Sequence, residues 1–154
     1  MLITSKSDYG LRAALHLARS SGLVTLREIS VERNIPQSIA SQVMRRLVAE
    51  GIVASKAGPT GGYRLARHPS DISAAEVLRA ADRDICIFKC VEPETCECEF
   101  AAECAFRGIL TGFGNSIKQQ LEALSLEHLV RGEVNLGQPD SCGLVCSVTE
   151  GVHQ

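Results

Sequence analysis

The first regular pattern along the chain is helical. Leu11, Ala14, Leu15 and Ala18 follow one another at spacings of three, one and three residues, so they share one face of a helix. Together with the polar residues before them, this spacing predicts an amphipathic helix over about residues 7–20.

Two further helices are predicted close behind the first. Thr25 and Glu28 form a capping-box pattern, which opens a short helix that continues to about Glu32. Pro36 suits the first turn of the next helix. The apolar positions of that helix, which lie on one face before Gly51 ends the run, are Ile39, Val43, Leu47 and Val48. Two helices joined by a short turn indicate a helix-turn-helix.

A β-hairpin is predicted directly after these helices. Residues 52–56 and 62–66 are β-prone, and the four residues Gly58 to Gly61 between them favour a turn. The hairpin carries Lys56, Arg64 and Arg67. A basic hairpin that follows a helix-turn-helix indicates a winged helix, in which one helix enters the major groove of DNA.

The second half of the chain predicts two more helices and a short final turn. Ser73 and Glu76 cap a helix over about residues 74–82, whose apolar side should pack on the preceding unit. A long helix follows, and Ser125 begins the final turn. The apolar stripe of the long helix consists of Phe106, Ile109, Leu110, Phe113, Ile117, Leu121 and Leu124.

The apolar stripe of the long helix has to be covered by another apolar surface. In so short a chain we expect it to pair with a second copy around a two-fold axis, which predicts a homodimer that faces a palindromic operator. The predicted fold is mainly α with a small β-hairpin wing. We expect a winged helix-turn-helix domain at 1–68, a linker helix, cysteine segment and dimerisation helix at 69–131, and a flexible tail at 132–154.

Charge divides the chain into two halves. Residues 1–68 carry ten Lys or Arg against four acids, a net +6, whereas residues 69–154 carry six against fourteen, a net −8. A basic unit is the electrostatic signature of a phosphate-backbone partner. The N-terminal half is therefore expected to bind double-stranded DNA.

Cysteine is concentrated in one stretch. Of the seven cysteines, five lie in residues 86–104, here called the cysteine segment, together with five glutamates. Such a segment has too little apolar surface to offset the entropy of ordering it unless something binds the sulfurs. The odd number of cysteines fits disulfides poorly, so ligands or redox thiols are favoured.

The expected compartment is the cytoplasm, with no membrane association. The first ten residues lack the apolar core of a signal peptide, and no apolar run approaches the ~18 residues of a membrane span. An enzyme is disfavoured because the sequence shows no cofactor fingerprint and no paired nucleophile and base.

These features together resemble the "Rrf-two" family of bacterial winged-helix regulators. The resemblance covers about residues 1–131. It rests on LITSKSDYGLRAALHLA, on LREISVERNIPQSIASQVMRRLVAEGIVAS, on GPTGGYRLA in the wing and on the cysteines that lead into AFRGIL. It implies a homodimeric transcription factor, usually a repressor, whose DNA affinity follows a bound iron-sulfur cluster, [4Fe-4S] or [2Fe-2S]. Some family relatives respond without a cluster to a small molecule or a protein partner.

The resemblance also implies a set of metal ligands. Three cysteines of the family pattern match Cys90, Cys98 and Cys104, and Cys96 is a close substitute for Cys98. Thiolates are the usual ligands of such clusters. The alternatives are zinc, for which the repeated C-x2-C pattern is missing, and metal-free redox thiols, whose pKa the neighbouring carboxylates would raise.

A fourth ligand comes, in the family, from the N-terminal helix of the other subunit. The matching residue is Asp8, whose carboxylate would be displaced more easily than a thiolate. Asp8 is equally well explained as an acid in the first turn of a helix. Cys86 or a tail cysteine is a further alternative, although Cys142 and Cys146 are expected to be two thiols in a loose tail.

The expected DNA contacts lie on the second helix of the helix-turn-helix and on the wing. Gln and Arg side chains make bidentate contacts to adenine and guanine edges. The candidates for base contacts are Ser38, Ser41, Gln42 and Arg45, and those for backbone or minor-groove contacts are Arg46, Lys56, Arg64 and Arg67. His16, between two leucines of the first helix, is expected to be a packing residue rather than a ligand.

Overall fold

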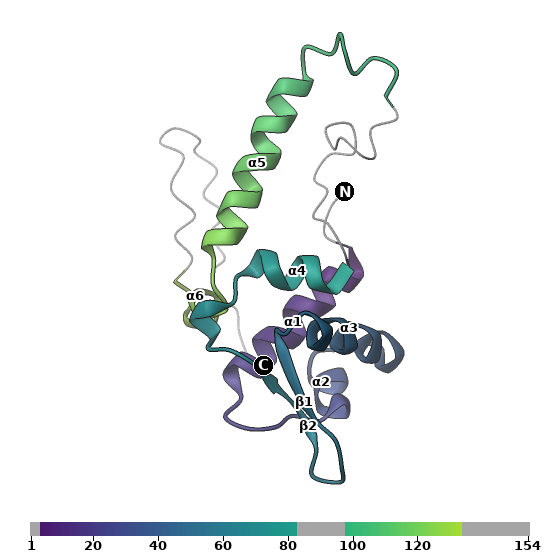
Figure 1. Cartoon of the computed structure of the whole chain (residues 1–154), viewed down its shortest axis with the longest axis vertical. Helices are drawn as coiled ribbons and strands as arrows, with labels where there is room; N and C mark the ends of the chain where they lie inside the picture. Colours follow the sequence, from purple (N-terminus) through teal and green to yellow (C-terminus); the bar gives the residue numbers. More distant parts are fainter. Residues whose placement is uncertain (1–3, 83–97, 134–154) are drawn as a thin grey trace, which may run out of the picture.

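The structure is a computed structural model that describes residues 4–82 and 98–133 of the chain. The described part is mainly helical, with one two-stranded antiparallel sheet (Figure 1). The elements in chain order are α1 (Ser5–Arg19), α2 (Leu26–Glu32), α3 (Gln37–Ala49), β1 (Val53–Lys56), β2 (Gly62–Leu65), the 3-10 helix η1 (Pro69–Asp71), α4 (Ala74–Asp82), α5 (Arg107–Ala123) and α6 (Leu126–Arg131).

Helix α1 begins earlier than the spacing of its apolar residues predicts. Thr4 is the N-cap, and its hydroxyl accepts a hydrogen bond from the backbone N–H of Ser7. The polar residues that were expected to precede the helix therefore form its first turn. The prediction of a start near residue 7 was wrong because it followed the apolar stripe and missed this cap.

The helix-turn-helix is confirmed. Thr25 and Glu28 form the predicted capping box at the start of α2. Asn34 has a φ of 51° in the turn, a left-handed conformation that Asn tolerates better than most residues. Pro36 is the N-cap of α3, one residue before the helix. Ile35 anchors the turn because it is buried and its N–H donates to the carbonyl oxygen of Ser30 at 2.9 Å.

The predicted hairpin is also confirmed, one residue shorter at each outer end. Strands β1 and β2 pair from Val53 with Leu65 to Lys56 with Gly62. A backbone bridge joins Tyr63 to Val24 in the α1–α2 connection, with hydrogen bonds of 2.9 Å and 2.8 Å. A Cβ atom on Gly62 would lie 2.7 Å from the Val24 carbonyl oxygen, so only glycine permits this approach.

One hydrophobic core joins the winged helix to the helices that follow it. Leu17, Ile29 and Leu47 from the first three helices are buried together with Val77 of α4 and Leu126 of α6. The apolar side of α4 packs on the first unit, as predicted. The core therefore continues beyond residue 68 and includes the elements on either side of α5.

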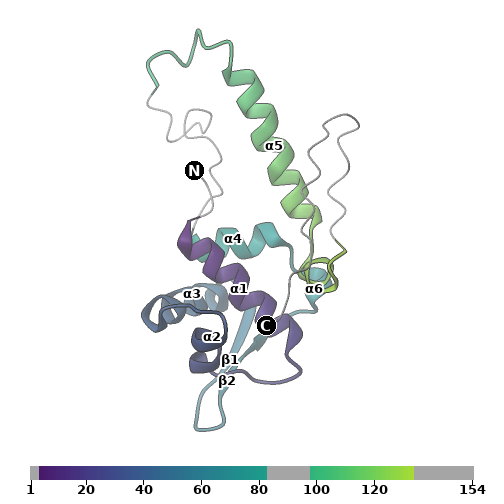
Figure 2. The same ribbon diagram turned by 180° about the vertical axis from the view of Figure 1, so that it is seen from behind.

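Helix α5 projects away from the other helices and the hairpin in both ribbon views (Figures 1 and 2). Its C-terminal end is fixed to α4: Leu121 packs against Ala75 and Leu78, and Arg79 forms an ion pair with Glu122 at 3.1 Å. The backbone of Ser73 bridges that of Ser125 just beyond α5. Within the described residues, no helix is long and apolar enough to cross a membrane.

Candidate nucleic-acid interface and cysteine segment

Helix α3 divides into a buried and an exposed face. Its buried residues are Ala40, Val43, Met44 and Leu47, which recur at helical spacing. The predicted base-contact residues lie on the other side: Ser38, Gln42 and Arg45 are exposed and Ser41 is half-buried. The fold thus presents these four side chains together on one helix, next to the hairpin.

The hairpin places two of its predicted DNA contacts on one face. Arg64 pairs with Ala54, and Lys56 pairs with Gly62. Because cross-strand partners and alternate residues share a face, Lys56 and Arg64 lie on the same side of the hairpin. The opposite side carries Val53, which is buried in the core. The two cations therefore point away from the core, and both are exposed.

Arg46 and Arg67, two further predicted backbone contacts, bond within the chain. Arg46 Nη1 donates to the carbonyl oxygen of Ala81 at 2.9 Å. Arg67 donates to the carbonyl oxygen of Asp71 at 2.9 Å and forms an ion pair with Glu76 at 2.8 Å. Both arginines therefore connect the winged helix to η1 and α4. These contacts were not predicted from the sequence.

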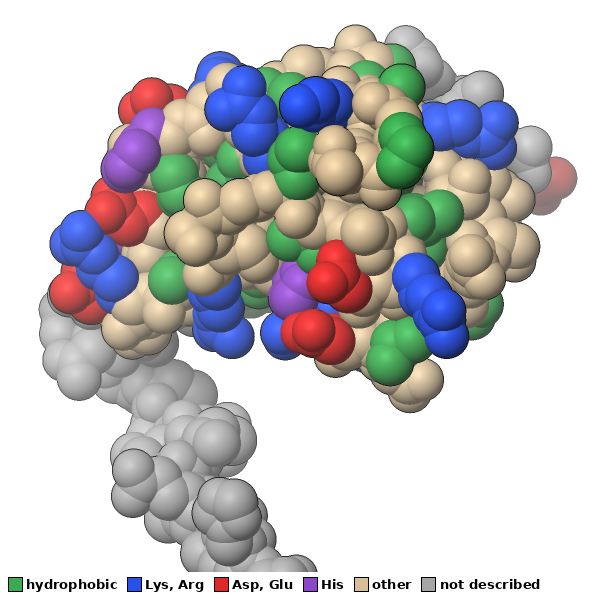
Figure 3. Space-filling view, turned by 90° about the horizontal axis from the view of Figure 1, so that it is seen from below, with side chains coloured by type: hydrophobic (Ala, Val, Ile, Leu, Met, Phe, Trp, Pro, Cys, Tyr) green, Lys and Arg blue, Asp and Glu red, His purple; other side chains and the backbone are tan. Residues whose placement is uncertain are grey.

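Figure 3 views the molecule from the end that carries the hairpin. Lys and Arg side chains are distributed over this end, among larger areas of uncharged surface. Acidic side chains form one small group beside a histidine and another along an edge. The basic groups are thus interspersed rather than fused into one patch, which suits contacts to separate phosphates.

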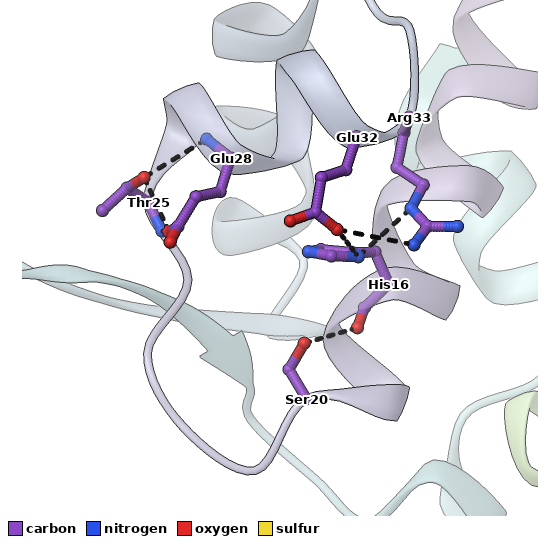
Figure 4. A network of polar contacts seen from close by, with 6 residues as sticks. All are labelled: His16, Ser20, Thr25, Glu28, Glu32 and Arg33. Carbon is purple, nitrogen blue, oxygen red and sulfur yellow. Dashed lines mark hydrogen bonds and ion pairs between the residues drawn. The ribbon is translucent and has the colours of Figure 1, made fainter.

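His16 lies in a polar network between α1 and α2 (Figure 4). Its side chain is buried, and its Nδ1 accepts a hydrogen bond from Arg33 Nε at 3.1 Å. Glu32 Oε2 lies 3.6 Å from the same nitrogen, and Ser20 Oγ donates to the His16 carbonyl oxygen at 2.8 Å. His16 is thus buried, as predicted, and its ring nitrogen takes part in a polar network that was not predicted from the sequence.

Two glutamates have a lowered pKa because they cap helices. The backbone N–H of Thr25, and then its hydroxyl, donate to Glu28 and lower the pKa of that carboxyl. For Glu76, burial acts to raise the pKa, but the N–H of Ser73 and the guanidinium of Arg67 together lower it below its ordinary value of 4.5. Both carboxylates stabilise the positive end of a helix.

Two of the predicted cluster ligands lie in the described residues. Cys98 and Cys104 are exposed free thiols. A series of turns joins them, in which Ala101 N–H donates to the Cys98 carbonyl oxygen at 3.1 Å and Arg107 N–H to that of Cys104 at 3.2 Å. The turns lead directly into α5.

The other cysteines that the sequence analysis named lie outside the described residues: Cys86, Cys90, Cys96, Cys142 and Cys146. Among residues 4–82 and 98–133, no group of three or more His, Cys, Asp or Glu could hold a metal ion. The described part of the cysteine segment thus contributes two thiols that a metal could reach from solvent.

Asp8 lies in the first turn of α1, as the helix-dipole argument predicts. Its carboxylate is half-exposed and forms an ion pair with Arg12 at 2.7 Å. In both ribbon views α1 lies in the body of the molecule, whereas the turns from Cys98 to Cys104 lie at the far end of α5 (Figures 1 and 2). The helix that carries Asp8 thus lies at the other end of α5 from the turns that carry these thiols.

Comparison with known proteins agrees with this architecture. Residues 3–132 match the family described as "Rrf2: Iron-dependent Transcriptional regulator". The chain is 34% identical over 135 residues to the HTH-type transcriptional regulator IscR of Photorhabdus laumondii, covering 86% of this chain and 81% of that protein. It is 31% identical over 132 residues to a helix-turn-helix regulator of Haemophilus influenzae, covering 84% and 87%.

Solved structures share the fold. CymR, described as the global cysteine regulator of B. subtilis, superposes with a TM-score of 0.67 at 26% identity, over 86% of this chain and 98% of that one. The IscR of T. potens has a TM-score of 0.68 at 21% identity, over 92% and 94%, which shows a common fold alone. This chain therefore belongs to the Rrf2 family of DNA-binding transcriptional regulators and is not an enzyme, as its match over residues 3–132 shows.

Proposed function

We propose that this regulator is a homodimeric repressor whose affinity for a palindromic operator is controlled by an iron-sulfur cluster. Cys90, Cys98 and Cys104 would supply thiolates, with Cys96 as the alternative to Cys98. Asp8 of the partner subunit would supply the fourth ligand. We place its activity in the cytoplasm, where the operator would lie.

The observation that carries this proposal is the pair of exposed free thiols at the head of α5. A structural cysteine is usually buried, whereas a sensing thiol has to be reached from solvent. Soft thiolate donors match iron-sulfur clusters, so the described residues fit the cofactor. When bound, such a cluster supplies iron that reacts with nitric oxide or oxygen and a charge that changes with its redox state.

The contribution of the chain is to hold the thiols at a distance from the body. Helix α5 is fixed to α4 at one end and carries the two thiols beyond its other end. We assign the fourth ligand to Asp8 of the partner subunit because the family resemblance implies a ligand from the N-terminal helix of the other subunit. The Asp8 carboxylate would have to exchange its ion pair with Arg12 for the metal.

The proposal of a homodimer rests on the exposed apolar side of α5. Four large side chains of the predicted stripe, each at least 41% exposed, are Phe106, Ile109, Phe113 and Ile117. Contiguous apolar surface of this kind is typical of protein interfaces. Two α5 helices packed around a two-fold axis would present two copies of α3 to successive half-sites of an operator.

Anaerobic purification tests the cofactor. The wild-type protein should be brown, with visible absorption and with iron and sulfide near stoichiometry. Cys98→Ala should lose both iron and colour, whereas Cys142→Ala should keep them. If Cys96→Ala loses the cluster and Cys98→Ala retains it, Cys96 is the ligand instead. A colourless preparation that contains only zinc and binds operator equally well would exclude the cluster.

The second candidate is a cluster-free regulator of the same fold. The similarity to CymR, described as a global cysteine regulator, supports it, as does the exposure of Cys98 and Cys104. Such a protein would contain no iron after anaerobic purification. Its operator affinity would change with thiol oxidation or an added effector, and would not change on treatment with an iron chelator.

A further inference from the structure

The C-terminal end of α4 is bonded to the recognition helix α3. Arg46 Nη1 donates to the carbonyl oxygen of Ala81 at 2.9 Å and lies 3.6 Å from Oδ1 of Asp82. Ala81 is fully buried, and Ala81 and Asp82 are the last two residues of α4. The contact joins residues 35 positions apart in the chain, so it is a tertiary link rather than a local one.

The chemistry of this contact is that of a helix C-cap. The last carbonyl groups of a helix have no partner within it, and they carry the negative end of the helix dipole. A guanidinium supplies both a positive charge and several donors in a fixed plane, so it can bond a carbonyl and a carboxylate at once. Arg46 therefore completes the end of α4 with a group that belongs to α3.

Asp82 also contacts α1. Its Oδ2 accepts a hydrogen bond from Thr4 Oγ1, the N-cap residue of α1. One turn earlier, the Leu78 carbonyl oxygen accepts from Ser7 Oγ at 3.4 Å. The carboxylate of Asp82 is thus shared between the first turn of α1, which carries Asp8, and the recognition helix.

The sequence connects this junction to the cysteines. Asp82 is followed four residues later by Cys86, the first residue of the cysteine segment. On α3, Arg46 directly follows Arg45 and lies one turn after Gln42, two of the expected base contacts. A displacement of the end of α4 would therefore act on α3 at the turn that faces DNA.

We propose that Arg46 is a positioning residue, which couples the end of α4 to the recognition helix, rather than a phosphate contact. The inference rests on the proposed function, in which the cysteine segment changes state. Loss of the Arg46 contact should leave DNA binding itself possible while uncoupling operator affinity from the state of the cysteines. Nη1 of the guanidinium is already bonded to the end of α4, which holds the side chain against α4 rather than extended from α3 toward a phosphate.

The test compares Arg46→Ala and Asp82→Asn with Arg45→Ala. Arg45 is the adjacent exposed cation of the same helix, and within the described residues it bonds only to the Ser41 carbonyl oxygen of that helix. The probe is a fluorescent duplex that the wild-type protein selects from a random-sequence pool. Its affinity is measured over a range of salt concentrations, with anaerobic protein and again after chelation of iron.

Arg45→Ala should reduce the salt slope by about 1, as for the loss of a phosphate or base-edge cation. Arg46→Ala and Asp82→Asn should keep the wild-type slope, and each should reduce the affinity ratio of the two protein states toward one. The double variant should lose no more coupling than Arg46→Ala alone, because Arg46→Ala already removes both the hydrogen bond to the Ala81 carbonyl oxygen and the ion pair with Asp82. A reduced slope in Arg46→Ala, with normal behaviour in Asp82→Asn, would overturn the proposal.

Arg46→Lys provides a second variant if Arg46→Ala fails to fold. Lysine keeps the charge but loses the planar fork, so it should restore a phosphate contact but not the coupling. If the wild-type affinity does not respond to chelation, the proposed cluster control has failed. In that case, equal losses of operator affinity in Arg46→Lys and Asp82→Asn, with the salt slope of the wild-type protein, would still support the positioning role. A changed salt slope in the Arg46 variants alone would still overturn it.

Discussion

A Cβ atom on Gly10 of α1 would lie 2.5 Å from the Cβ of Ala81 in α4. The two helices therefore cross at a point where only a glycine fits. Gly10→Ala should lower the free energy of unfolding by about 1–3 kcal/mol, the usual cost of overpacking a core. Urea denaturation measures the change.

Two further variants identify the cause of this loss. Gly22→Ala is the matched control, because a Cβ atom there meets nothing within 4 Å, and it should be close to neutral. Adding Ala81→Gly to Gly10→Ala removes the opposing methyl group and should recover part of the lost stability. A double variant no more stable than Gly10→Ala would show that this crossing is not the source.

The cations of the hairpin should determine the salt dependence of DNA binding. Lys56→Ala and Arg64→Ala should each weaken binding to all sequences alike and reduce the salt slope by about 1, if each removes the proposed contact to phosphate. Fluorescence anisotropy over a salt series measures both quantities. Arg131→Ala removes the same charge from α6, away from the hairpin, and should leave the slope unchanged.

The exposed side of α5 should determine the oligomeric state. Phe113, which is 58% exposed in one chain, is expected to be buried by the second copy. Phe113→Glu places a charge in that interface and should shift the protein from dimer to monomer in sedimentation velocity. Gln119→Glu introduces the same charge on another side of the helix and should remain dimeric. An unchanged dimer in Phe113→Glu would exclude this face.

Glu76 should contribute stability above mildly acidic pH. Its pKa is lowered in the folded protein by Ser73 and Arg67 against the opposing effect of burial. The contribution is therefore present above the unfolded pKa and is lost as the pH falls through the folded value. Between about pH 6 and pH 3, wild-type protein should lose more stability than Glu76→Gln in urea denaturation. Equal losses would argue against this linkage.

Local chemistry in the sequence predicts much of the fold. The Thr25–Glu28 and Ser73–Glu76 boxes each join residues three positions apart, so their helix starts are visible in the sequence. The box at Ser125 uses His128 in place of Glu or Gln, which hides it from the usual pattern. Apolar spacing likewise predicts the buried face of α4. On α3 it predicts Val43 and Leu47, but Ala40 and Met44 are buried in place of Ile39 and Val48, which are half-buried.

The contacts that position the candidate site are not predictable in this way. Arg46 and Ala81, or Arg67 and Glu76, meet only after the helices have packed. From sequence alone an arginine on a helix and one on a wing look equally available to DNA. In the folded chain, Arg46 and Arg67 bond to groups of α4 and η1, whereas Arg45, in the part of the chain that the structure describes, bonds only to the Ser41 carbonyl oxygen of its own helix.

The backbone bridge between Tyr63 and Val24 fixes the hairpin to the connection before α2. The two backbones lie in close contact at Gly62, because the Val24 carbonyl oxygen occupies the space that a side chain would fill. The backbone beside Arg64 is therefore held in one place relative to the connection before α2. If the wing cannot move, a half-site that does not match its placement has to bend or twist to bind, and the cost of that deformation falls on base pairs that the protein does not touch.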